Sequence, residues 1–356
     1  MRRTVFWAAI MLGAGACLAG DPVVSNVRAL QRGGGSRLVD IRYDAADTDG
    51  DRLSVTVTLT DNGAPVPAAS VTGDIGAGVR PGTGKQIVWD AGADWSGNLS
   101  ENVRATVTAD DGRTPAVPQG MVRIPGGTNS GTDPDFGAYS LTVEAFYMDA
   151  TEVTKAKWDE VYAWAIAHGY SFDHVGSGKA ANHPVHTVSW YDVVKWCNAR
   201  SQKEGRTPCY NLSTWACDFA ANGYRLPTVA EWVYAARGGQ SGRRFPWGDT
   251  ITHSQANYYS SSSYSYDVSP TRGSHPTYAT GGYPYTSPAG AFAANGYGLY
   301  DMAGNVWEWC NDTSGSIRTL RGGSWNFNAY YARCGYCYWY YPDYAYSNFG
   351  FRAVCR

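Results

Sequence analysis

From Gln240 to the end of the chain, the apolar residues show no helical spacing. The region is instead dense in Gly, Tyr and Trp, which the whole chain contains 42, 26 and 14 times. Glycine permits tight turns, and aromatic side chains bury large areas, so this composition favours irregular loops held together by ring packing. The sequence therefore predicts a C-terminal domain with few long helices.

Three helices are predicted before this region. They are expected from Thr154 to Gly169, from near Ser189 to near Gly205, and from Thr228 to Gly238. The third has the clearest start, because Thr228 and Glu231 have the spacing of a capping box. In that motif the two side chains satisfy backbone N–H groups of the first turn.

Residues 20–112 are typical of a small all-β module. Ser54–Thr60 and Val103–Ala109 alternate polar and apolar residues without a break, which indicates strands with one buried face. Several short strands of this kind predict a β-sandwich that resembles immunoglobulin or fibronectin type III modules. Residues 113–120, with Pro115 and Pro118, are the predicted linker, and residues 121–356 form the second domain.

The first 19 residues have the order of a secretory signal peptide: Arg2 and Arg3, an apolar run from Val5 to about Ala16, then small residues. Cys17 leaves a lipoprotein as the less favoured alternative, because Ala14 stands where Leu is expected. No later segment is long and apolar enough to span a bilayer. We therefore expect an exported protein: secreted, periplasmic or on the cell surface.

Composition narrows the class of partner. Hydrophobic residues make up 44% of the chain, which suffices for a sizeable core and excludes wholesale disorder. The formal net charge of −2 lacks the basic excess that phosphate binding needs, so no nucleic-acid partner is expected. Seven of the eight cysteines lie beyond the signal peptide, and disulfides are the default expectation in an oxidising compartment, with their pairing undetermined.

Asp47, Asp49 and Asp51 form an acidic stretch in the β module. They could hold Ca²⁺, but no bidentate Glu follows at the spacing of a calcium loop. A solvated turn is the favoured interpretation.

The second domain carries a series of ordered motifs. They are Met121–Gly127, Arg225–Thr228, Glu231-Trp232, Ala235–Gly238, Phe245–Gly248, Asn295–Asp301, Gly304–Trp309, Arg321–Trp325 and Gly350–Arg352. This series resembles the sulfatase-modifying-factor family, whose founding activity is the formylglycine-generating enzyme. The resemblance implies an α+β domain with an irregular variant of the C-type lectin fold.

Fold does not establish activity. The family's oxidase binds copper through two cysteines, three and eight residues beyond the Ser of the Gly-Gly-Ser motif. Those positions are Phe327 and Ala332 here, and neither side chain provides a thiolate. We therefore expect no copper and no catalytic residue, and a non-catalytic protein is favoured over an enzyme.

Two other sets of residues could provide a catalytic site in place of the missing cysteines. Cys334 and Cys337 form a Cys-x-x-Cys pair, for which a structural disulfide or two incidental thiols is favoured. Ergothioneine-pathway relatives use histidine-bound iron, and His183 and His186 are the nearest candidates. No further histidine cluster accompanies them, so ordinary packing or surface roles are favoured.

The resemblance also implies structural Ca²⁺. The family's ligands correspond to the side chains of Asp301 and Glu308 and the carbonyls of Gly304 and Val306. Carboxylates and carbonyls suit this hard cation. The second family site keeps Asn257, Tyr258 and Tyr283, but Gly281 stands where an Asp is expected.

Residues 326–349 carry eight Tyr among Asn, Ser, Ala and Gly, with no Val, Ile or Leu. A segment of this composition between two scaffold motifs is typical of a paratope. Tyr gives a large contact area, and small polar residues can adapt their hydrogen bonds to a ligand. The candidate ligand-binding residues are Asn326, Asn328, Tyr330, Tyr331, Tyr336, Tyr338, Trp339, Tyr340, Tyr341, Tyr344, Tyr346 and Asn348. We expect Tyr338 to Tyr346 to form an exposed aromatic face.

The segment is also similar to the variable region of diversity-generating-retroelement proteins. In those proteins mutagenesis of adenines turns Asn codons into codons for Tyr, Ser, Asp, Phe, Cys, Gly or Ala. Most residues of the segment fit this set, and Trp339 does not.

The sequence therefore predicts an exported, non-catalytic binder of a protein or glycan outside the cytoplasm. A divergent oxidase that uses Cys334 and Cys337 is the alternative. A structural cell-surface module with a fixed partner is a third possibility.

Overall fold

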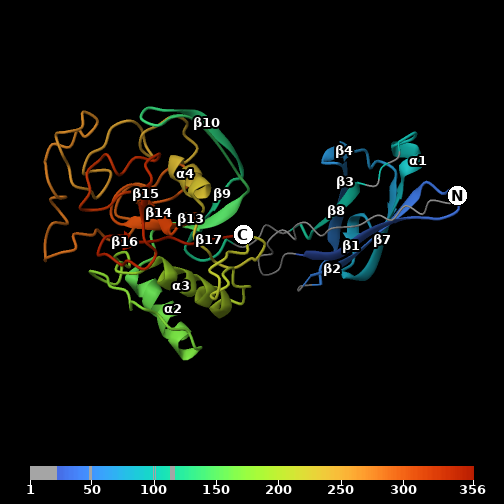
Figure 1. Ribbon diagram of the computed structural model, residues 1–356, viewed down its shortest axis with the longest axis horizontal. Coiled ribbons are helices and arrows are strands. Elements are labelled where there is room, and N and C mark those ends of the chain that lie inside the picture. Colours follow the sequence, from blue (N-terminus) through green and yellow to red (C-terminus); the bar gives the residue numbers. More distant parts are fainter. Residues whose placement is uncertain (1–21, 48–49, 99, 101, 113–116) are drawn as a thin grey trace. The chain divides into compact units, whose positions relative to one another are not determined.

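The computed structural model describes residues 22–356, apart from 48–49, 99, 101 and 113–116. The predicted signal peptide, including Cys17, lies outside the described residues. The chain divides into two compact units, one that ends at residue 116 and one that spans Val117–Arg356 (Figure 1). Among the described residues, no helix is long and apolar enough to cross a membrane.

The N-terminal unit contains two antiparallel sheets. Its strands are β1 (Val23–Gln31), β2 (Leu38–Ala46), β3 (Leu53–Asp61), β4 (Ala64–Val66), β5 (Val71–Gly73), β6 (Gly76–Val79), β7 (Gly82–Asp90) and β8 (Val103–Asp110), with the short helix α1 (Ala91–Asp94) after β7. One sheet has the order β1-β2-β7-β5, and the other joins β4, β3 and β6, with β8 also paired to β3. Buried residues of both sheets, among them Ile41, Leu53 and Ile87, form one hydrophobic cluster.

The two alternating runs predicted from the sequence are the paired strands β3 and β8. They run antiparallel, with partners from Ser54 and Asp110 to Asp61 and Val103. On β3 the side chain of Leu53 is buried and that of the next residue is exposed, as period-two alternation requires.

The C-terminal unit is built from short strands and long loops. Its strands are β9 (Met121–Ile124), β10 (Gly127–Asp133), β11 (Gly137–Val143), β12 (Phe146–Asp149), β13 (Trp307–Ser314), β14 (Ile317–Arg321), β15 (Tyr338–Tyr340), β16 (Phe349–Gly350) and β17 (Val354–Cys355). They form the hairpin β10-β11, the sheet β17-β12-β9 and the sheet β15-β14-β13-β16.

The three predicted helices are confirmed. They are α2 (Lys155–Ala167), α3 (Trp190–Lys203) and α4 (Val229–Arg237). The capping box of Thr228 and Glu231 is formed, and Gly238 ends α4 with a left-handed backbone (φ 54°). No α-helix follows α4, in agreement with the absence of helical spacing after Gln240.

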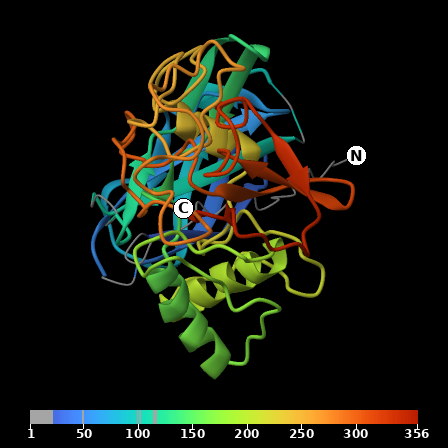
Figure 2. The same ribbon diagram turned by 90° about the vertical axis from the view of Figure 1, so that its left-hand side faces the viewer.

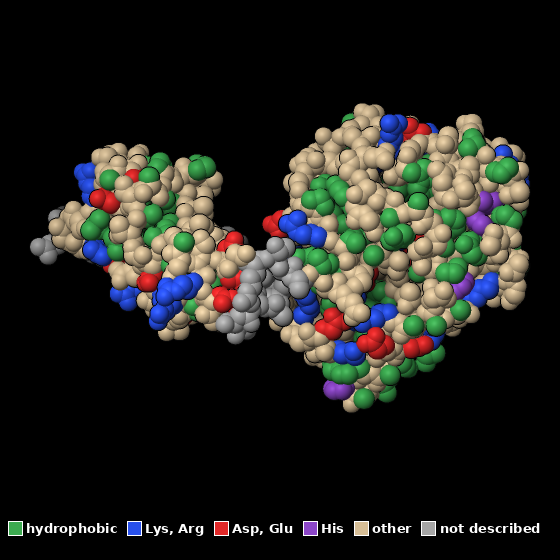
Figure 3. All heavy atoms as spheres, turned by 180° about the vertical axis from the view of Figure 1, so that it is seen from behind, with side chains coloured by type: hydrophobic (Ala, Val, Ile, Leu, Met, Phe, Trp, Pro, Cys, Tyr) green, Lys and Arg blue, Asp and Glu red, His purple; other side chains and the backbone are tan. Residues whose placement is uncertain are grey.

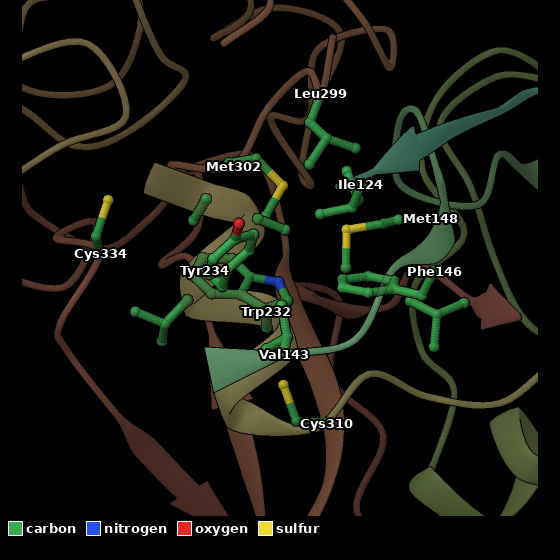
Figure 4. Packing of buried hydrophobic residues seen from close by; sticks show 14 residues of the cluster. Ile124, Val143, Phe146, Met148, Trp232, Tyr234, Leu299, Met302, Cys310 and Cys334 are labelled. Carbon is green, nitrogen blue, oxygen red and sulfur yellow. The ribbon is translucent and has the colours of Figure 1, made fainter. Parts of the chain in front are cut away.

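The core of this unit lies around α4. Trp232 and Tyr234 pack among Ile124, Phe146 and Met148 of the sheet β17-β12-β9 (Figure 4). Two further members, Met302 and Cys310, belong to the loop before β13 and to β13 itself. The core therefore fixes the start of the C-terminal loops that carry the candidate site.

One face of the C-terminal unit shows few charges. On the face seen in Figure 3, neutral side chains cover most of the area and charged groups gather toward its edges. In Figure 2, red strands and loops of the C-terminal part lie along one side of the unit, whereas the last residues, from Gly350 to Cys355, are buried.

Candidate functional site

The Tyr-rich segment 326–349 is held at both ends by buried residues. Before it, the Arg321 guanidinium donates to the carbonyls of Gly335 (3.2 Å) and Tyr336 (2.6 Å). After it, Gly350 lies so close to Val185 that an added Cβ would be 2.6 Å from the Val185 carbonyl oxygen. The segment therefore leaves and returns to the scaffold at fixed points.

The first half of the segment forms an aromatic layer on Trp307, which begins β13 and is fully buried. We call this layer the inner cluster; it consists of Phe327, Tyr330, Tyr331, Tyr336 and Tyr338. Trp307 stacks on Tyr338 with 5.1 Å between ring centroids, and Phe327 meets it edge-on at 5.5 Å. The rings of the inner cluster are half-buried, so each ring packs on its neighbours with one part and is accessible to solvent with the other.

The second half forms an outer cluster of Tyr340, Tyr341, Tyr344 and Tyr346. The buried Phe349 packs against this cluster: its ring centroid lies 5.4 Å from that of Tyr340 and 5.2 Å from that of Tyr346. The hydroxyls of Tyr340 and Tyr346 are 3.0 Å apart, and this hydrogen bond raises the pKa of Tyr340 to about 12. Tyr341, Tyr344 and Tyr346 are 54%, 44% and 41% exposed, so this part of the segment offers the most aromatic surface.

Two of the candidate ligand-binding residues do not lie on the exposed aromatic face. Trp339 is exposed, but it stands between Tyr338 and Tyr340 on β15, and side chains alternate between the faces of a strand. It therefore projects from the opposite face. Asn348 is buried, because its amide donates to Ser324 Oγ (3.3 Å) and Asn326 Oδ1 (3.0 Å) and so ties the two ends of the segment together.

The other two asparagines stay near the surface. Asn326 is exposed, and Asn328 is half-buried, with its side-chain oxygen accepting from the Tyr330 N–H (3.1 Å).

A buried arginine anchors the inner cluster. The Arg333 guanidinium lies 3.8 Å from the ring centroid of Tyr330, and its Nη1 is 3.0 Å from an Asp135 carboxylate oxygen. Hydrogen bonds from Arg244 and Arg333 outweigh the effect of burial and lower the pKa of Asp135. The inner cluster is therefore fixed to the loop between β10 and β11.

The structure adds aromatic residues that lie outside the Tyr-rich segment. The ring centroids of Tyr264 and Tyr330 are 5.6 Å apart. The Tyr259 N–H donates a hydrogen bond to the Phe327 carbonyl (3.0 Å). Tyr283 is 77% exposed and lies 5.5 Å from Trp325, which precedes the segment. The run at 258–266 contains only Tyr and Ser, and this Tyr-rich signal could have identified it.

The positions of the family's catalytic cysteines lie within this aromatic region. Phe327 belongs to the inner cluster, and Ala332 is buried among Phe245, Ala303 and Ala329. Cys334 is fully buried, and burial raises its pKa to about 12, while burial also raises the pKa of Cys337. These environments disfavour the thiolates that a copper site needs.

All seven cysteines beyond the signal peptide are unpaired thiols, so the expected disulfides, including one between Cys334 and Cys337, are not formed in this structure. Cys334 and Cys310 instead pack as apolar groups in the core around α4.

The two candidate iron ligands make local contacts. His183 Nδ1 is 2.9 Å from Thr286 Oγ1, and His186 Nδ1 is 2.9 Å from Thr187 Oγ1. Burial lowers the pKa of His186 to about 4. In the described part of the chain, neither histidine belongs to a group of three metal-ligating side chains.

The proposed calcium ligands differ in how far their side-chain oxygens are already hydrogen-bonded. Asp301 is buried; its Oδ2 accepts from the Gly290 N–H, and its Oδ1 has no hydrogen-bond partner. Both oxygens of Glu308 are occupied, by Arg352 (2.7 and 2.8 Å) and by the Trp232 indole N–H (2.6 Å). Gly304 and Val306 lie in the loop between them.

At the second family site, Asn257 Oδ1 is buried without a partner, while the Tyr258 carbonyl lies 3.1 Å from His253 Nε2. Gly281 supplies no carboxylate there.

In the N-terminal unit, Asp47, Asp51 and Asp111 offer ligand atoms within 4.8 Å of one another, and Asp49 lies outside the described residues. The Asp51 N–H donates to Asp47 Oδ2 (3.0 Å), a contact typical of the predicted turn.

Together these features define a class of protein: a domain of few helices and short sheets that displays an aromatic C-terminal segment on a rigid frame. The sulfatase-modifying factor enzyme 1-like domain matches residues 107–356, and the chain belongs to that family. The formylglycine-generating enzyme of Mus musculus is 30% identical over 368 residues, covering 81% of this chain and 87% of its own.

Two further relatives bear on function. The protein named inactive C-alpha-formylglycine-generating enzyme 2 of Mus musculus is 31% identical over 274 residues, covering 66% of this chain and 85% of its own. Among solved structures, Treponema denticola variable protein 1 is 26% identical with a TM-score of 0.51, covering 68% of this chain and 98% of that one. Because one relative is named as an enzyme and another as inactive, membership of the family does not decide whether this chain is catalytic.

Proposed function

We propose that this is an exported, non-catalytic ligand-binding protein that presents residues 326–349 as its binding surface. One observation carries the proposal: none of the eight tyrosines in the segment is buried, whereas Arg321, Trp325 and Arg352 of the framing motifs are. A rigid frame with accessible Tyr rings suits recognition, because the rings offer contact area at low entropic cost.

The divergent oxidase is the weaker candidate. It needs two accessible thiolates at copper-binding distance, and Cys334 packs in the core while Phe327 and Ala332 occupy the family's positions. Incubation with copper and a sulfatase-type cysteine peptide should give no formylglycine by mass spectrometry. Aldehyde formation that depends on Cys334 or Cys337 would favour the oxidase.

The segment is also proposed to be diversified. The named similarity to a Treponema denticola variable protein supports this, as does the division within the segment. Its Tyr side chains reach solvent, while Arg333 is buried and structural. A neighbouring reverse transcriptase gene and a near-copy of the 3′ coding segment that differs only at adenines would test the proposal.

The ligand is proposed to be a protein or glycan outside the cytoplasm, and the N-terminal unit to be an immunoglobulin-like sandwich. Its two sheets with one shared core support the sandwich.

A structural Ca²⁺ at Asp301 is part of the proposal. The buried Oδ1 of Asp301 has no hydrogen-bond partner, and an unsatisfied carboxylate oxygen inside a protein fits a cation ligand.

The binding surface is tested with the triple variant Tyr341→Ser, Tyr344→Ser and Tyr346→Ser. A glycan array and a random-peptide display library serve as probes for the wild-type protein. The variant should lose the interactions selected by the wild type. Trp339→Ser is the matched control, because Trp339 is 47% exposed on the opposite face of β15 and its loss should leave binding unchanged. Retained binding by the triple variant would show that the outer cluster is not the site.

A further inference from the structure

One cation lies at the edge of the outer cluster. β15 pairs with β14 at one edge of the sheet β15-β14-β13-β16 (Figure 1), and Arg318 on β14 is the partner of Tyr340 on β15. Side chains of directly opposite residues in an antiparallel pair lie on the same face of the sheet, with Cβ atoms about 5 Å apart. The Arg318 side chain therefore starts beside Tyr340, a member of the proposed binding surface.

Arg318 is held in place by a buried aromatic ring. Its guanidinium carbon lies 3.8 Å from the ring centroid of Trp190, which is fully buried, and its Nη1 donates to the Asn311 carbonyl (3.0 Å). The Trp190 ring is itself fixed, because its indole N–H donates to the Cys310 carbonyl (3.0 Å). A guanidinium that stacks on a fixed ring is preorganised, so it loses little entropy when it binds a further group.

Within the described part of the chain, the positive charge of Arg318 is not neutralised by an ion pair. The Asp312 carboxylate acts on it, but this carboxylate already accepts a hydrogen bond from the Val229 N–H (2.6 Å). Burial lowers the pKa of Arg318, whereas at Arg352 the charge of Glu308 outweighs burial and raises the pKa. Because a guanidinium stays protonated in proteins, Arg318 keeps a half-buried charge that an external anion can neutralise.

Aromatic surface continues from the outer cluster to the start of α3. The Trp190 N–H donates to the Pro342 carbonyl (2.9 Å), which fixes the turn of the outer cluster on this end of the helix. Tyr191, which acts on Arg318, is half-buried, and its ring centroid lies 4.6 Å from that of the half-buried Trp215. Tyr, Trp and Arg are the residue types most enriched at the energetic centres of protein interfaces. The combination therefore favours a protein as the partner.

We propose that the binding surface takes an acidic protein segment, and that Arg318 pairs with an Asp or Glu carboxylate of this partner while the outer cluster packs on the neighbouring side chains. This inference rests on the proposed function and names the class of its ligand. Beyond the Nη1 bond to Asn311, the planar guanidinium offers further N–H donors that suit the two oxygens of a carboxylate. Because Trp190 already shields one face of the guanidinium from water, the ion pair should be stronger than one at an open surface.

Selection from the random-peptide display library tests this ligand class on the full chain. Peptides that bind the wild-type protein should be enriched in Asp and Glu over the unselected library. A selected peptide whose acidic residues are replaced by Asn or Gln should bind the wild type about tenfold more weakly. Arg318→Gln should weaken binding of the acidic peptide by a similar factor and leave its amide version unchanged, because either change removes the same ion pair.

Lys203→Gln is the matched control. It also removes one positive charge, but Lys203 is the last residue of α3, about 20 Å along the helix from Trp190, and is paired with Glu160 (2.6 Å). Its loss should leave the affinity for the acidic peptide unchanged. An equal loss of affinity in this variant would show that net charge, and not Arg318, attracts the peptide.

The outcomes distinguish this inference from the proposed function. If the selected peptides require Tyr341, Tyr344 and Tyr346 but show no acidic enrichment and bind Arg318→Gln equally well, only the acidic ligand class is wrong. If the wild type selects no peptide, the protein partner is wrong, and binding of a sulfated or sialylated glycan on the array would identify the other class. If it binds neither peptide nor glycan, the proposed function fails as well. Should Arg318→Gln fail to fold, the two peptides decide on the wild-type protein, because equal binding of the acidic and amide versions overturns the proposal.

Discussion

Returning cysteine to positions 327 and 332 tests whether the family's copper site has been replaced by aromatic packing. Phe327 contacts Trp307, Tyr331 and Tyr338 in the inner cluster. Complete removal of a buried Phe ring costs about 3 to 5 kcal/mol, so for this half-buried ring we expect a loss of about 2 kcal/mol.

At Ala332 the cysteine would be larger than the residue it replaces. It is 1% exposed, and an added Cβ on Gly323 would lie 3.1 Å from the Ala332 Cα, so the surroundings are tight. Adding a sulfur atom there should cost about 1 to 3 kcal/mol through overpacking. The double variant Phe327→Cys, Ala332→Cys should therefore be about 3 to 5 kcal/mol less stable, and a domain of this size should melt roughly 6 to 20 °C lower.

The assay combines thermal unfolding, followed by near-ultraviolet circular dichroism, with copper(I) titration against a competing chelator. The matched control is Phe327→Ser, Ala332→Ser, which makes a similar change in size without introducing thiols. We expect both variants to be destabilised and neither to bind copper stoichiometrically. The argument that aromatic rings occupy the copper site would be refuted if the cysteine variant kept the wild-type melting temperature and bound one copper ion per protein molecule.

Three further predictions follow from named contacts. Tyr341→Ser, at a ring that is 54% exposed, should cost about 1 kcal/mol in urea unfolding, and Tyr338→Ser, at a ring stacked on Trp307, about 2; equal costs would contradict the inner and outer division. Thr228→Ala should cost about 1 kcal/mol through loss of the α4 cap, and Thr228→Ser should restore it. Because the pKa of Asp135 is lowered in the folded state, its contribution to stability is present above the unfolded pKa and lost as the pH falls through the folded pKa; Asp135→Asn should flatten that acid dependence, and an unchanged pH profile would show that Asp135 contributes nothing.

The helices and the location of the binding segment were predictable because their signals are local. The capping box of Thr228 and Glu231 depends on spacing alone, and the Tyr-rich composition of residues 326–349 is visible in the sequence. The direction of Trp339 is not predictable from the sequence, because it depends on the pairing of β15 with β14. Glu152, which follows β12 in the chain, is buried in the structure although nothing in the sequence indicates it.

Under the proposed function, loss of catalysis and gain of a binding surface are one structural change. A cysteine at position 327 would remove the ring that meets Trp307 edge-on and contacts Tyr338. Tyr338 in turn lies 6.1 Å from Tyr340, which connects the inner cluster to the outer one. The same position therefore cannot provide a copper ligand and also support the aromatic layer.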